Sequence, residues 1–368
     1  MKALILTVST GGGHNSAALA VHEEFKSRGV ECATLDVCYH VSEILGFTVS
    51  KGYLLSIDAL AKSYSTVYRR LEKRKKHSFS PIVGSFSLLA ARLLGFVSDF
   101  APDVIVCTHV FAALAVKHLR SRYKISAKTV GILTDFTVHP FWEDVTELDY
   151  LVIPSERLEF QCLKKGFKRE QLLAYGIPLK KAMQTSVPRE EARKALGLYP
   201  DKTVITVMGG SMGYGGIADT VKKIDKLSKR FQIIAVCGSS EREYRKLCNV
   251  KLQHRTLRFS YTDKIPLILD ATDCLITKPG GLSVSEALAK GVPMILTNPI
   301  PGHEERNETF ITNLGAAVRT TKQTEIDEVL WQLLSDSEQL KAMARCAKSN
   351  GHRFSVEILV NKLLIDNQ

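Results

Sequence analysis

Two glycine-rich segments of this sequence could bind a phosphorylated ligand through their main-chain amides. The first, TVSTGGGHNSAA, has glycines at 11–13, directly after an expected strand and before an expected helix. Such a turn lets backbone approach a ligand closely, and the helix amino end attracts phosphate. It matches neither GxGxxG nor the GK[ST] ending of a P-loop. The second, ITVMGGSMGYGG, repeats the order at Gly209, Gly210, Ser211 and Gly213.

His14 follows the first glycines and is expected at the carboxyl end of a sheet, where such folds bind ligands. An imidazole, with an unperturbed pKa near ~6.5, could accept a proton from a hydroxyl there. The alternative is a histidine that caps the helix by bonding to backbone.

Residues 273–307, DCLITKPGGLSVSEALAKGVPMILTNPIPGHEERN, carry the most specific pattern. A strand ends at Lys278, and Ser283 and Glu286 then open a helix, so that a carboxylate in its first turn could bind two ribose hydroxyls. Alternatively, Ser283 and Glu286 form only an S-x-x-E capping box. A proline-bounded loop then presents polar groups suited to sugar hydroxyls: His303, Glu304, Glu305 and Asn307.

Short apolar runs alternate with helical patterns in both halves, which predicts an α/β class with parallel, doubly wound sheets. In the first half we expect strands at Ala3–Ser9, Glu31–Asp36, Val104–Cys107 and Thr129–Leu133, and a helix at Ser16–Arg28. In the second half we expect strands at Thr203–Val207, Gln232–Val236, Asp273–Thr277 and Met294–Thr297, and helices that begin at Ile217 and Ser283.

The length of 368 residues favours two domains. Prolines at 178, 188 and 200 interrupt the sheet pattern and mark the junction. We therefore predict an N-terminal domain at 1–180, a C-terminal domain at 181–340, and a helical segment at 341–368 that packs back on the first domain; the family resemblance described below implies that the first domain meets the acceptor and the second binds the nucleotide sugar.

The net charge of +12 suits an anionic partner: phosphate, nucleic acid or an acidic membrane. Residues 62–77 concentrate this charge, with Arg69, Arg70 and Lys73 among them, and an apolar stretch containing Phe86 follows. This order is typical of an element that rests on an anionic bilayer, or of a solvated helix followed by a core helix.

Three further patterns argue against a membrane-spanning, a secreted or a zinc-binding protein. Arg92 and Asp99 interrupt the most apolar stretch, so no membrane-spanning helix is expected. The beginning of the sequence reads as a strand, which predicts no secretion. Eight cysteines without paired short spacing predict reduced core thiols rather than a zinc site.

The segment KPGGLSVSEALAKGVPMILTNPIPGHEERN, together with STGGGHNSAA, TDFTVHPFW, YGIP, GGSMG and FSYTDKIP, resembles glycosyltransferase family 28. The resemblance is strongest to its diacylglycerol branch, the monogalactosyldiacylglycerol synthases and processive glucosyltransferases, and extends over both halves. It implies a GT-B fold, in which two Rossmann-like domains flank a cleft. It implies no metal and no cofactor, because the UDP-sugar is a substrate.

The resemblance also implies roles for particular residues. His14 is the candidate general base, with Asp135 and His109 as further candidates. His139 and Trp142, with Arg69, Arg70, Lys73 and Phe86, would meet the acceptor or the membrane. The donor would be bound by Gly12, Gly13, Lys180, Gly210, Ser211, Gly213, Phe259, Ser260, Lys278, Gly281, Leu282, Ser283, Glu286, Glu304, Glu305 and Asn307.

Two positions depart from the family pattern. After Gly-Ile-Pro the family usually continues with arginine and proline, whereas this chain has Leu179 and Lys180, so a point charge replaces bidentate recognition. Val110 stands where the plant-type enzymes tend to have proline after the histidine that matches His109.

We therefore expect inverting, metal-independent transfer of a hexose from a UDP-hexose to diacylglycerol, or to a glycosylated diacylglycerol, at the cytoplasmic face of a membrane. One alternative is transfer of N-acetylglucosamine to an undecaprenyl-linked peptidoglycan precursor; the glutamate pair and the PIPGHEERN segment favour the diacylglycerol branch. A third candidate is a non-catalytic basic module that binds nucleic acid or an anionic membrane, which leaves the polar segment unexplained. No nucleic-acid partner is expected.

Overall fold

The structure is a computed structural model that describes residues 1–9, 12–41 and 81–367, without the side chains of residues 41 and 81–88. It divides into two compact units. Unit 1 consists of Met1–Lys181, Pro301–His303 and Phe354–Gln368; unit 2 consists of Ala182–Ile300 and Glu304–Arg353. Residues 341–353, which the sequence prediction grouped with the final helix, thus lie in unit 2.

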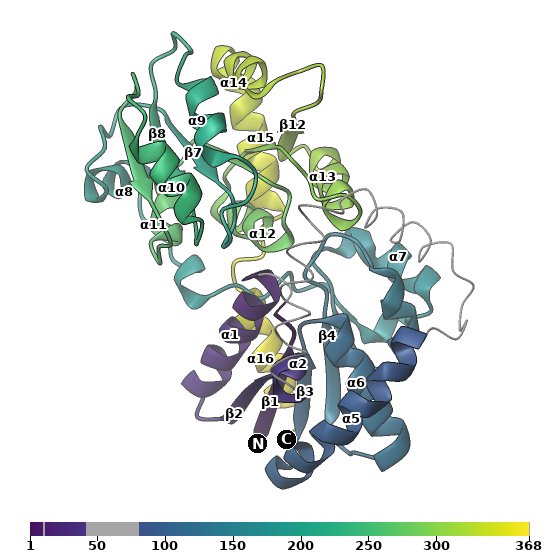
Figure 1. The fold of residues 1–368 in the computed structure, drawn as a ribbon. Helices are drawn as coiled ribbons and strands as arrows, with labels where there is room; N and C mark the ends of the chain where they lie inside the picture. The colour runs from purple at the N-terminus through teal and green to yellow at the C-terminus, as the bar shows by residue number, and fades with distance from the viewer. Residues whose placement is uncertain (10–11, 42–80, 368) are drawn as a thin grey trace. The chain divides into compact units, whose positions relative to one another are not determined.

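Unit 1 is a parallel sheet with helices on both faces (Figure 1). The order of its described strands is β2-β1-β3-β4-β5-β6. They are β1 (Lys2–Thr7), β2 (Glu31–Asp36), β3 (Val104–Cys107), β4 (Lys128–Ile132), β5 (Tyr150–Val152) and β6 (Leu172–Leu173). The helices are α1 (Gly12–Ser27), α2 (Val37–Val41), α5 (Pro81–Phe100), α6 (Val110–Tyr123), α7 (Glu159–Lys165), α16 (Ser355–Ile365) and the short 3-10 turns η1 (Pro140–Val145), η2 (Glu156–Leu158) and η3 (Arg169–Gln171). A further 3-10 turn, η4 (Lys181–Met183), begins at the last residue of the segment Met1–Lys181 and continues into unit 2.

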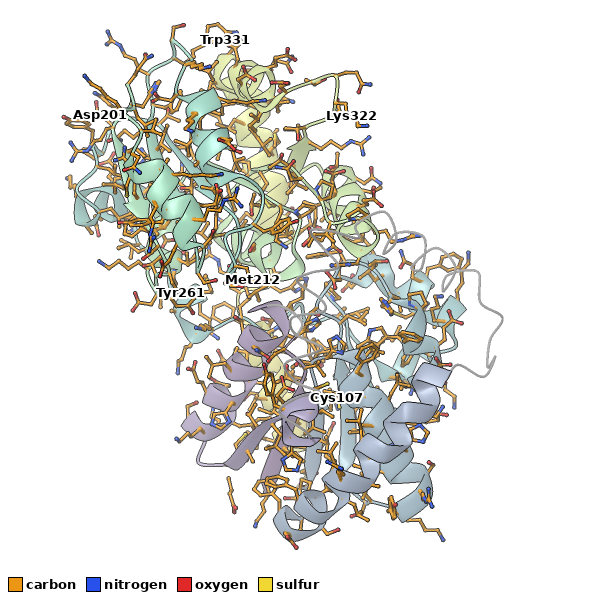
Figure 2. All side chains as sticks on the ribbon, viewed as in Figure 1. Cys107, Asp201, Met212, Tyr261, Lys322 and Trp331 are labelled. Atoms are coloured by element: carbon orange, nitrogen blue, oxygen red, sulfur yellow. The ribbon has the colours of Figure 1, made fainter. Side chains whose placement is uncertain are left out.

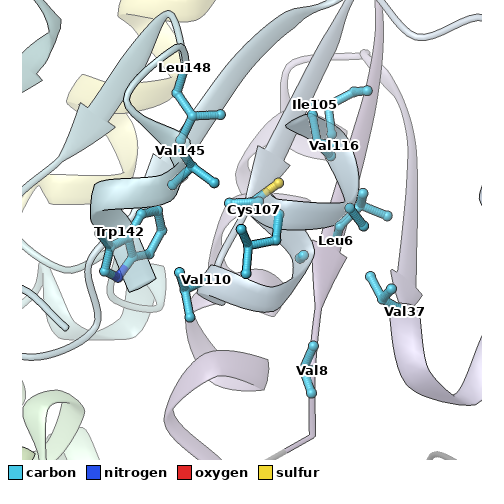
Figure 3. Packing of buried hydrophobic residues seen from close by; sticks show 14 of the residues in the cluster. Leu6, Val8, Val37, Ile105, Cys107, Val110, Val116, Trp142, Val145 and Leu148 are labelled. Carbon is cyan, nitrogen blue, oxygen red and sulfur yellow. The ribbon is translucent and has the colours of Figure 1, made fainter. Parts of the chain in front are cut away.

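Alternation along β1 builds both faces of this sheet, because successive side chains of a strand point to opposite sides. Leu4 and Leu6 pack with α5 and α6, whereas Ala3 and Ile5 pack with α1 and α16. Figure 3 shows the first of these faces, where Val110 and Val116 of α6 lie near Cys107. A strand buried on both faces must be apolar throughout, which is why the sequence predicts these strands so well.

The last helix of the chain belongs to unit 1. α16 packs on α1 and contributes Leu359 and Leu363 to their shared core. Ser355 secures its beginning, since its hydroxyl donates to the carbonyl of Ile177 at 2.8 Å and accepts from the amide of Leu179 at 3.2 Å.

Unit 2 repeats the architecture, which confirms the predicted α/β class with two Rossmann-like domains. The order of its described strands is β12-β11-β10-β7-β8-β9, all parallel. They are β7 (Val204–Met208), β8 (Gln232–Val236), β9 (Thr256–Phe259), β10 (Cys274–Thr277), β11 (Met294–Leu296) and β12 (Ala317–Arg319). The helices are α8 (Arg189–Ala195), α9 (Ile217–Ile224), α10 (Glu241–Cys248), α11 (Ile265–Ala271), α12 (Gly281–Lys290), α13 (His303–Asn313), α14 (Ile326–Ser335) and α15 (Ser337–Ser349).

Each sheet has one point at which the strand order reverses. In unit 1 it lies between β1 and β3, and in unit 2 between β7 and β10. Ligands of doubly wound folds bind outside the carboxyl ends of the strands at such a switch point. Gly12, Gly13 and His109 follow the switch-point strands of unit 1, and the second glycine-rich segment and Lys278 follow those of unit 2.

Among the described residues, no helix is both long enough and apolar enough to cross a membrane. The eight cysteines are free thiols; Cys38, Cys107, Cys162, Cys237 and Cys274 are buried, whereas Cys248 is exposed.

Candidate active site

His14 lies in the first turn of α1, at the switch point of unit 1. The predicted helix start at Ser16 is wrong: α1 begins at Gly12, so Gly12 and Gly13 are helical residues rather than a turn before the helix. Gly11 lies outside the described residues. An earlier helix start brings His14 onto the helix itself, where its side chain reaches the turn after β3.

The hydrogen bonds of His14 decide its tautomer. Its Nδ1 lies 2.8 Å from the carbonyl oxygen of Thr108, and because a carbonyl can only accept, Nδ1 must carry the proton. Burial lowers the pKa of His14, while the charge of Asp135 acts in the opposite direction. A neutral ring with its proton on Nδ1 has its lone pair on Nε2, which is the state that a general base requires.

His109 has the opposite tautomer. It is the N-cap of α6, and its Nδ1 accepts from the backbone amide of Phe111 at 3.0 Å. Because an amide N–H can only donate, the proton of a neutral His109 ring lies on Nε2. Burial lowers its pKa well below the usual value, with the charges of His14 and His139 adding to the effect. The capping role considered for His14 therefore belongs to His109, and this tautomer does not suit a base.

The two rings stand edge to face, with centroids 4.5 Å apart. His139 repeats the capping arrangement, since its Nδ1 accepts from the amide of Phe141 at the start of η1. Trp142, predicted to meet the acceptor or membrane, is instead a core residue with 4% of its surface exposed. It packs over β4, where a Cβ on Gly131 would come within 2.6 Å of the indole, and Figure 3 shows it in the core with Val145.

Asp135 and Thr134 follow β4, next to β3 in the sheet. Both are partly exposed, and the Thr134 hydroxyl lies 3.0 Å from Nδ1 of His14. The sequence analysis missed Thr134, although the TDF segment that contains it was part of the resemblance. A threonine beside an aspartate after a strand carries no signal of its own.

The turn after β7 in unit 2 requires its glycines. Gly210 and Gly213 have φ angles of 71° and 64°, which side chains rarely adopt. A Cβ on Gly213 would lie 1.8 Å from the carbonyl oxygen of Cys237, and the Ser211 carbonyl accepts from the amide of Ser239 at 2.8 Å. The turn therefore packs directly against the backbone at the end of β8, whereas the Ser211 side chain is exposed. Met212, in the same turn, is labelled in Figure 2.

The turn after β10 leads into a helix with a free amino end. α12 begins at Gly281, and no side chain of the described residues caps it. Ser283 therefore does not cap the helix, and Glu286 lies in its second turn rather than the first. The first amides of such a helix have no intrahelical partner, so they are available to an anion. Leu282 and Ser283 lie in this turn, partly exposed.

A buried ion pair holds Lys278 beside these turns. Its ammonium bonds to Oε1 of Glu304, whose Oε2 accepts from the amide of Ile300 at 2.9 Å. The Lys278 side chain is 14% exposed and that of Glu304 only 3%. A Cβ on Gly210 would lie 3.5 Å from Lys278, which places this cation next to the β7 turn.

The polar residues after β11 form the start of α13, not the loop that the sequence predicted. Glu304 orients Lys278, and its burial leaves little surface for a sugar. Asn307 has no exposed surface, and its amide donates to the carbonyl of Pro279 at 3.0 Å, so it supports the β10 turn. The residue of this group that is exposed and still suited to a sugar is Glu305.

The remaining predicted residues are distributed as follows. Phe259 ends β9 and is partly exposed, with Ser260 exposed directly after it in unit 2. Lys180 is exposed in unit 1. α5 packs into the core from Leu89 onward, as the core-helix alternative predicted. Arg69, Arg70, Lys73 and the side chain of Phe86 lie outside the described residues.

Two family models match this chain. The monogalactosyldiacylglycerol (MGDG) synthase model matches residues 14–179, and the glycosyltransferase family 28 C-terminal domain model matches residues 204–358. The chain belongs to glycosyltransferase family 28. Membership makes it a glycosyltransferase, as the resemblance implied, with His14 in the first matched region and Lys278 in the second.

Similar proteins align with this chain over nearly its whole length. Processive diacylglycerol beta-glucosyltransferases of Bacillus pumilus (strain SAFR-032) and Bacillus subtilis (strain 168) are each 28% identical to it. The first alignment covers 99% of this chain and 94% of the relative, and the second 100% and 96%. The crystal structure of Acinetobacter baumannii MurG is 15% identical with a TM-score of 0.67, and covers 100% of this chain and 99% of MurG. The fold is GT-B.

No group of three or more histidine, cysteine, aspartate or glutamate side chains in the described part of the chain is arranged to hold a metal ion.

Proposed function

We propose that this family 28 enzyme transfers a hexose from a UDP-hexose to diacylglycerol, or to a diacylglycerol that already carries sugar. The names of its full-length relatives support diacylglycerol as the acceptor and a β-linked product. A single displacement on an α-linked nucleotide sugar inverts the anomeric carbon and gives that linkage. The observation that carries the mechanism is the tautomer of His14.

In this mechanism His14 is the general base. The acceptor oxygen attacks the anomeric carbon, its proton passes to Nε2 of His14, and the bond from that carbon to the β-phosphate oxygen breaks. Proton transfer by a positioned side chain typically contributes ~10²–10⁴-fold to the rate. The charge of Asp135 favours the imidazolium that forms, as its effect on the pKa of His14 indicates.

Unit 2 binds the donor in this proposal. The glycine turn after β7 and the uncapped amino end of α12 offer main-chain N–H groups to the diphosphate, and Lys278 adds a positive charge. Such fixed donors stabilise the departing UDP without a metal ion. Glu286 binds the ribose, and the backbone of Ser260 binds the uracil.

The enzyme works at the cytoplasmic face of a membrane, as a peripheral protein. Its acceptor is a membrane lipid, and its net charge of +12 attracts it to anionic lipid. The basic cluster within residues 62–77, which contains Arg69, Arg70 and Lys73, contributes this contact together with His139.

The test is incubation of the purified full-length chain with diacylglycerol liposomes and either UDP-glucose, UDP-galactose or UDP-N-acetylglucosamine, followed by mass spectrometry of the lipids. We expect a hexosyl-diacylglycerol with one of the two UDP-hexoses. Matched vesicles without diacylglycerol are the control. Binding of UDP in calorimetry without any glycolipid product would overturn the lipid assignment, and transfer from UDP-N-acetylglucosamine to an undecaprenyl-linked acceptor alone would replace it.

A further inference from the structure

The protonated nitrogen of His14, Nδ1, has two hydrogen-bond acceptors: the Thr134 hydroxyl and the main-chain carbonyl of Thr108. The Thr134 hydroxyl oxygen lies 3.0 Å from Nδ1 of His14, and the carbonyl oxygen of Thr108 lies 2.8 Å from the same atom. Thr134 follows β4, whereas Thr108 follows β3. The ring is therefore held by the segments that follow two neighbouring strands. One acceptor is a main-chain carbonyl, and the other is a side-chain hydroxyl.

The two acceptors differ in how freely they can move. The Thr108 carbonyl is part of the main chain and follows a fully buried strand. The Thr134 hydroxyl can rotate, yet here it must accept, because the carbonyl already requires a proton on Nδ1. Two acceptors converging on one N–H restrict rotation of the imidazole, since a flipped ring would place a carbon against both oxygens.

We propose that Thr134 is a positioning residue for the transfer reaction, which keeps Nε2 of His14 aimed at the acceptor hydroxyl and supports the imidazolium formed during transfer. This inference rests on the proposed role of His14 as the base. Hydrogen bonds to a charged partner are stronger than those to a neutral one, so the Thr134 contact gains strength when His14 is protonated.

Other charged and titratable groups act on the same ring. Asp135 raises the pKa of His14, His303 lowers it, and burial outweighs both; the His109 ring lies against it in the neutral state described above. Thr134 adds no charge. Its removal therefore changes the stability of the imidazolium without changing these charges.

The test compares Thr134→Val, which keeps the shape and removes the hydroxyl, with Thr134→Ser, which keeps the hydroxyl. For Thr134→Val we expect kcat to fall about three- to tenfold and the acidic limb of the pH profile to move about 0.5–1 unit lower. The KM values for both substrates stay unchanged. Thr134→Ser stays within about twofold of the parent enzyme. Thr137→Val, a buried threonine in the same segment, is the matched control.

The outcomes separate this inference from the proposed function. His14→Ala is assayed in parallel. Loss of turnover in His14→Ala with an unchanged pH profile in Thr134→Val overturns the role of Thr134 alone. Equal losses in the valine and serine variants also overturn it, because the hydroxyl would then be irrelevant. Full turnover in His14→Ala overturns the base assignment and this inference with it.

Discussion

The two switch points use the same order of strand, glycine segment and helix for different chemistry. In unit 1 Gly12 and Gly13 are helical residues, and the groups that gather at the strand ends are titratable: His14, His109 and Asp135. In unit 2 the glycines form a turn that excludes side chains, and a buried ion pair stands beside it. In the proposed function, the groups of unit 1 accept a proton and those of unit 2 bind the diphosphate.

The difference shows what each glycine segment does. α1 begins at Gly12 and therefore carries His14 in its first turn. Gly213 lets the β7 turn touch the backbone of Cys237, which sets the path of the amides. Similar sequence patterns therefore position a side chain in one unit and the main chain in the other.

The largest effect that distinguishes the two switch points is expected from His14→Ala. Removal of the base should lower kcat by about 10²–10⁴-fold. Affinity for UDP should stay unchanged, because unit 2 binds the donor in the proposed function. Steady-state kinetics and calorimetry with UDP measure the two quantities. His22→Ala, on the same helix with its ring bonded to Thr34, is the control. Near-normal turnover in His14→Ala would exclude the histidine as the base.

Gly213→Ala should produce the reverse pattern. The new Cβ would collide with a backbone carbonyl at φ 64°, so we expect a loss of about 2–5 kcal/mol in the free energy of unfolding. UDP affinity should fall at least about tenfold as the amides move. Gly197→Ala is the control, because Gly197 has φ 71° with nothing within 4 Å. An intact UDP affinity in Gly213→Ala would contradict a main-chain diphosphate site.

The smallest effect concerns acid stability in unit 1. An unfolded histidine titrates near ~6.5, whereas His109 in the folded chain has a pKa well below this. Below pH ~6.5 the unfolded state therefore binds a proton that the folded state does not. The free energy of unfolding then decreases by up to ~1.4 kcal/mol for each pH unit by which the pH is lowered. His109→Asn keeps an oxygen to cap Phe111 and removes this titration.

Urea unfolding at pH 8, 6.5 and 5 measures the effect of His109→Asn. The variant should match the parent chain at pH 8 and lose less stability toward pH 5. His14 keeps its own contribution of the same sign in both proteins. An identical loss in both would show that His109 takes up a proton in the folded chain.

The sequence predicts the sheets better than the site. Central strands such as Val104–Cys107 and Gln232–Val236 are buried on both faces, so their apolar runs mark their bounds. β6 and β12 were missed because they are very short edge strands without such a run. The position of His14 at the carboxyl end of the sheet also followed from the sequence, because His14 comes shortly after the first predicted strand.

The misassigned residues share a physical reason. Trp142 was expected to meet the acceptor or the membrane through the family resemblance, and Asn307 to face a sugar because its amide suits hydroxyls. Both are buried, and burial depends on packing against distant segments. Glu304 is bonded to a lysine that precedes it by 26 residues. The tautomer of His14 depends on a carbonyl that lies 94 residues away along the chain, and that of His109 on its local role as the N-cap of α6. Residue types alone reveal neither.

The tautomers of these two histidines test the account most directly. Nitrogen-15 NMR of the histidine-labelled chain at neutral pH, with His14→Gln and His109→Asn used for assignment, distinguishes a protonated ring nitrogen from one with a lone pair. We predict that His14 carries its proton on Nδ1 and His109 on Nε2. A proton on Nε2 of His14 would leave no lone pair for the acceptor hydroxyl and would contradict its role as the base.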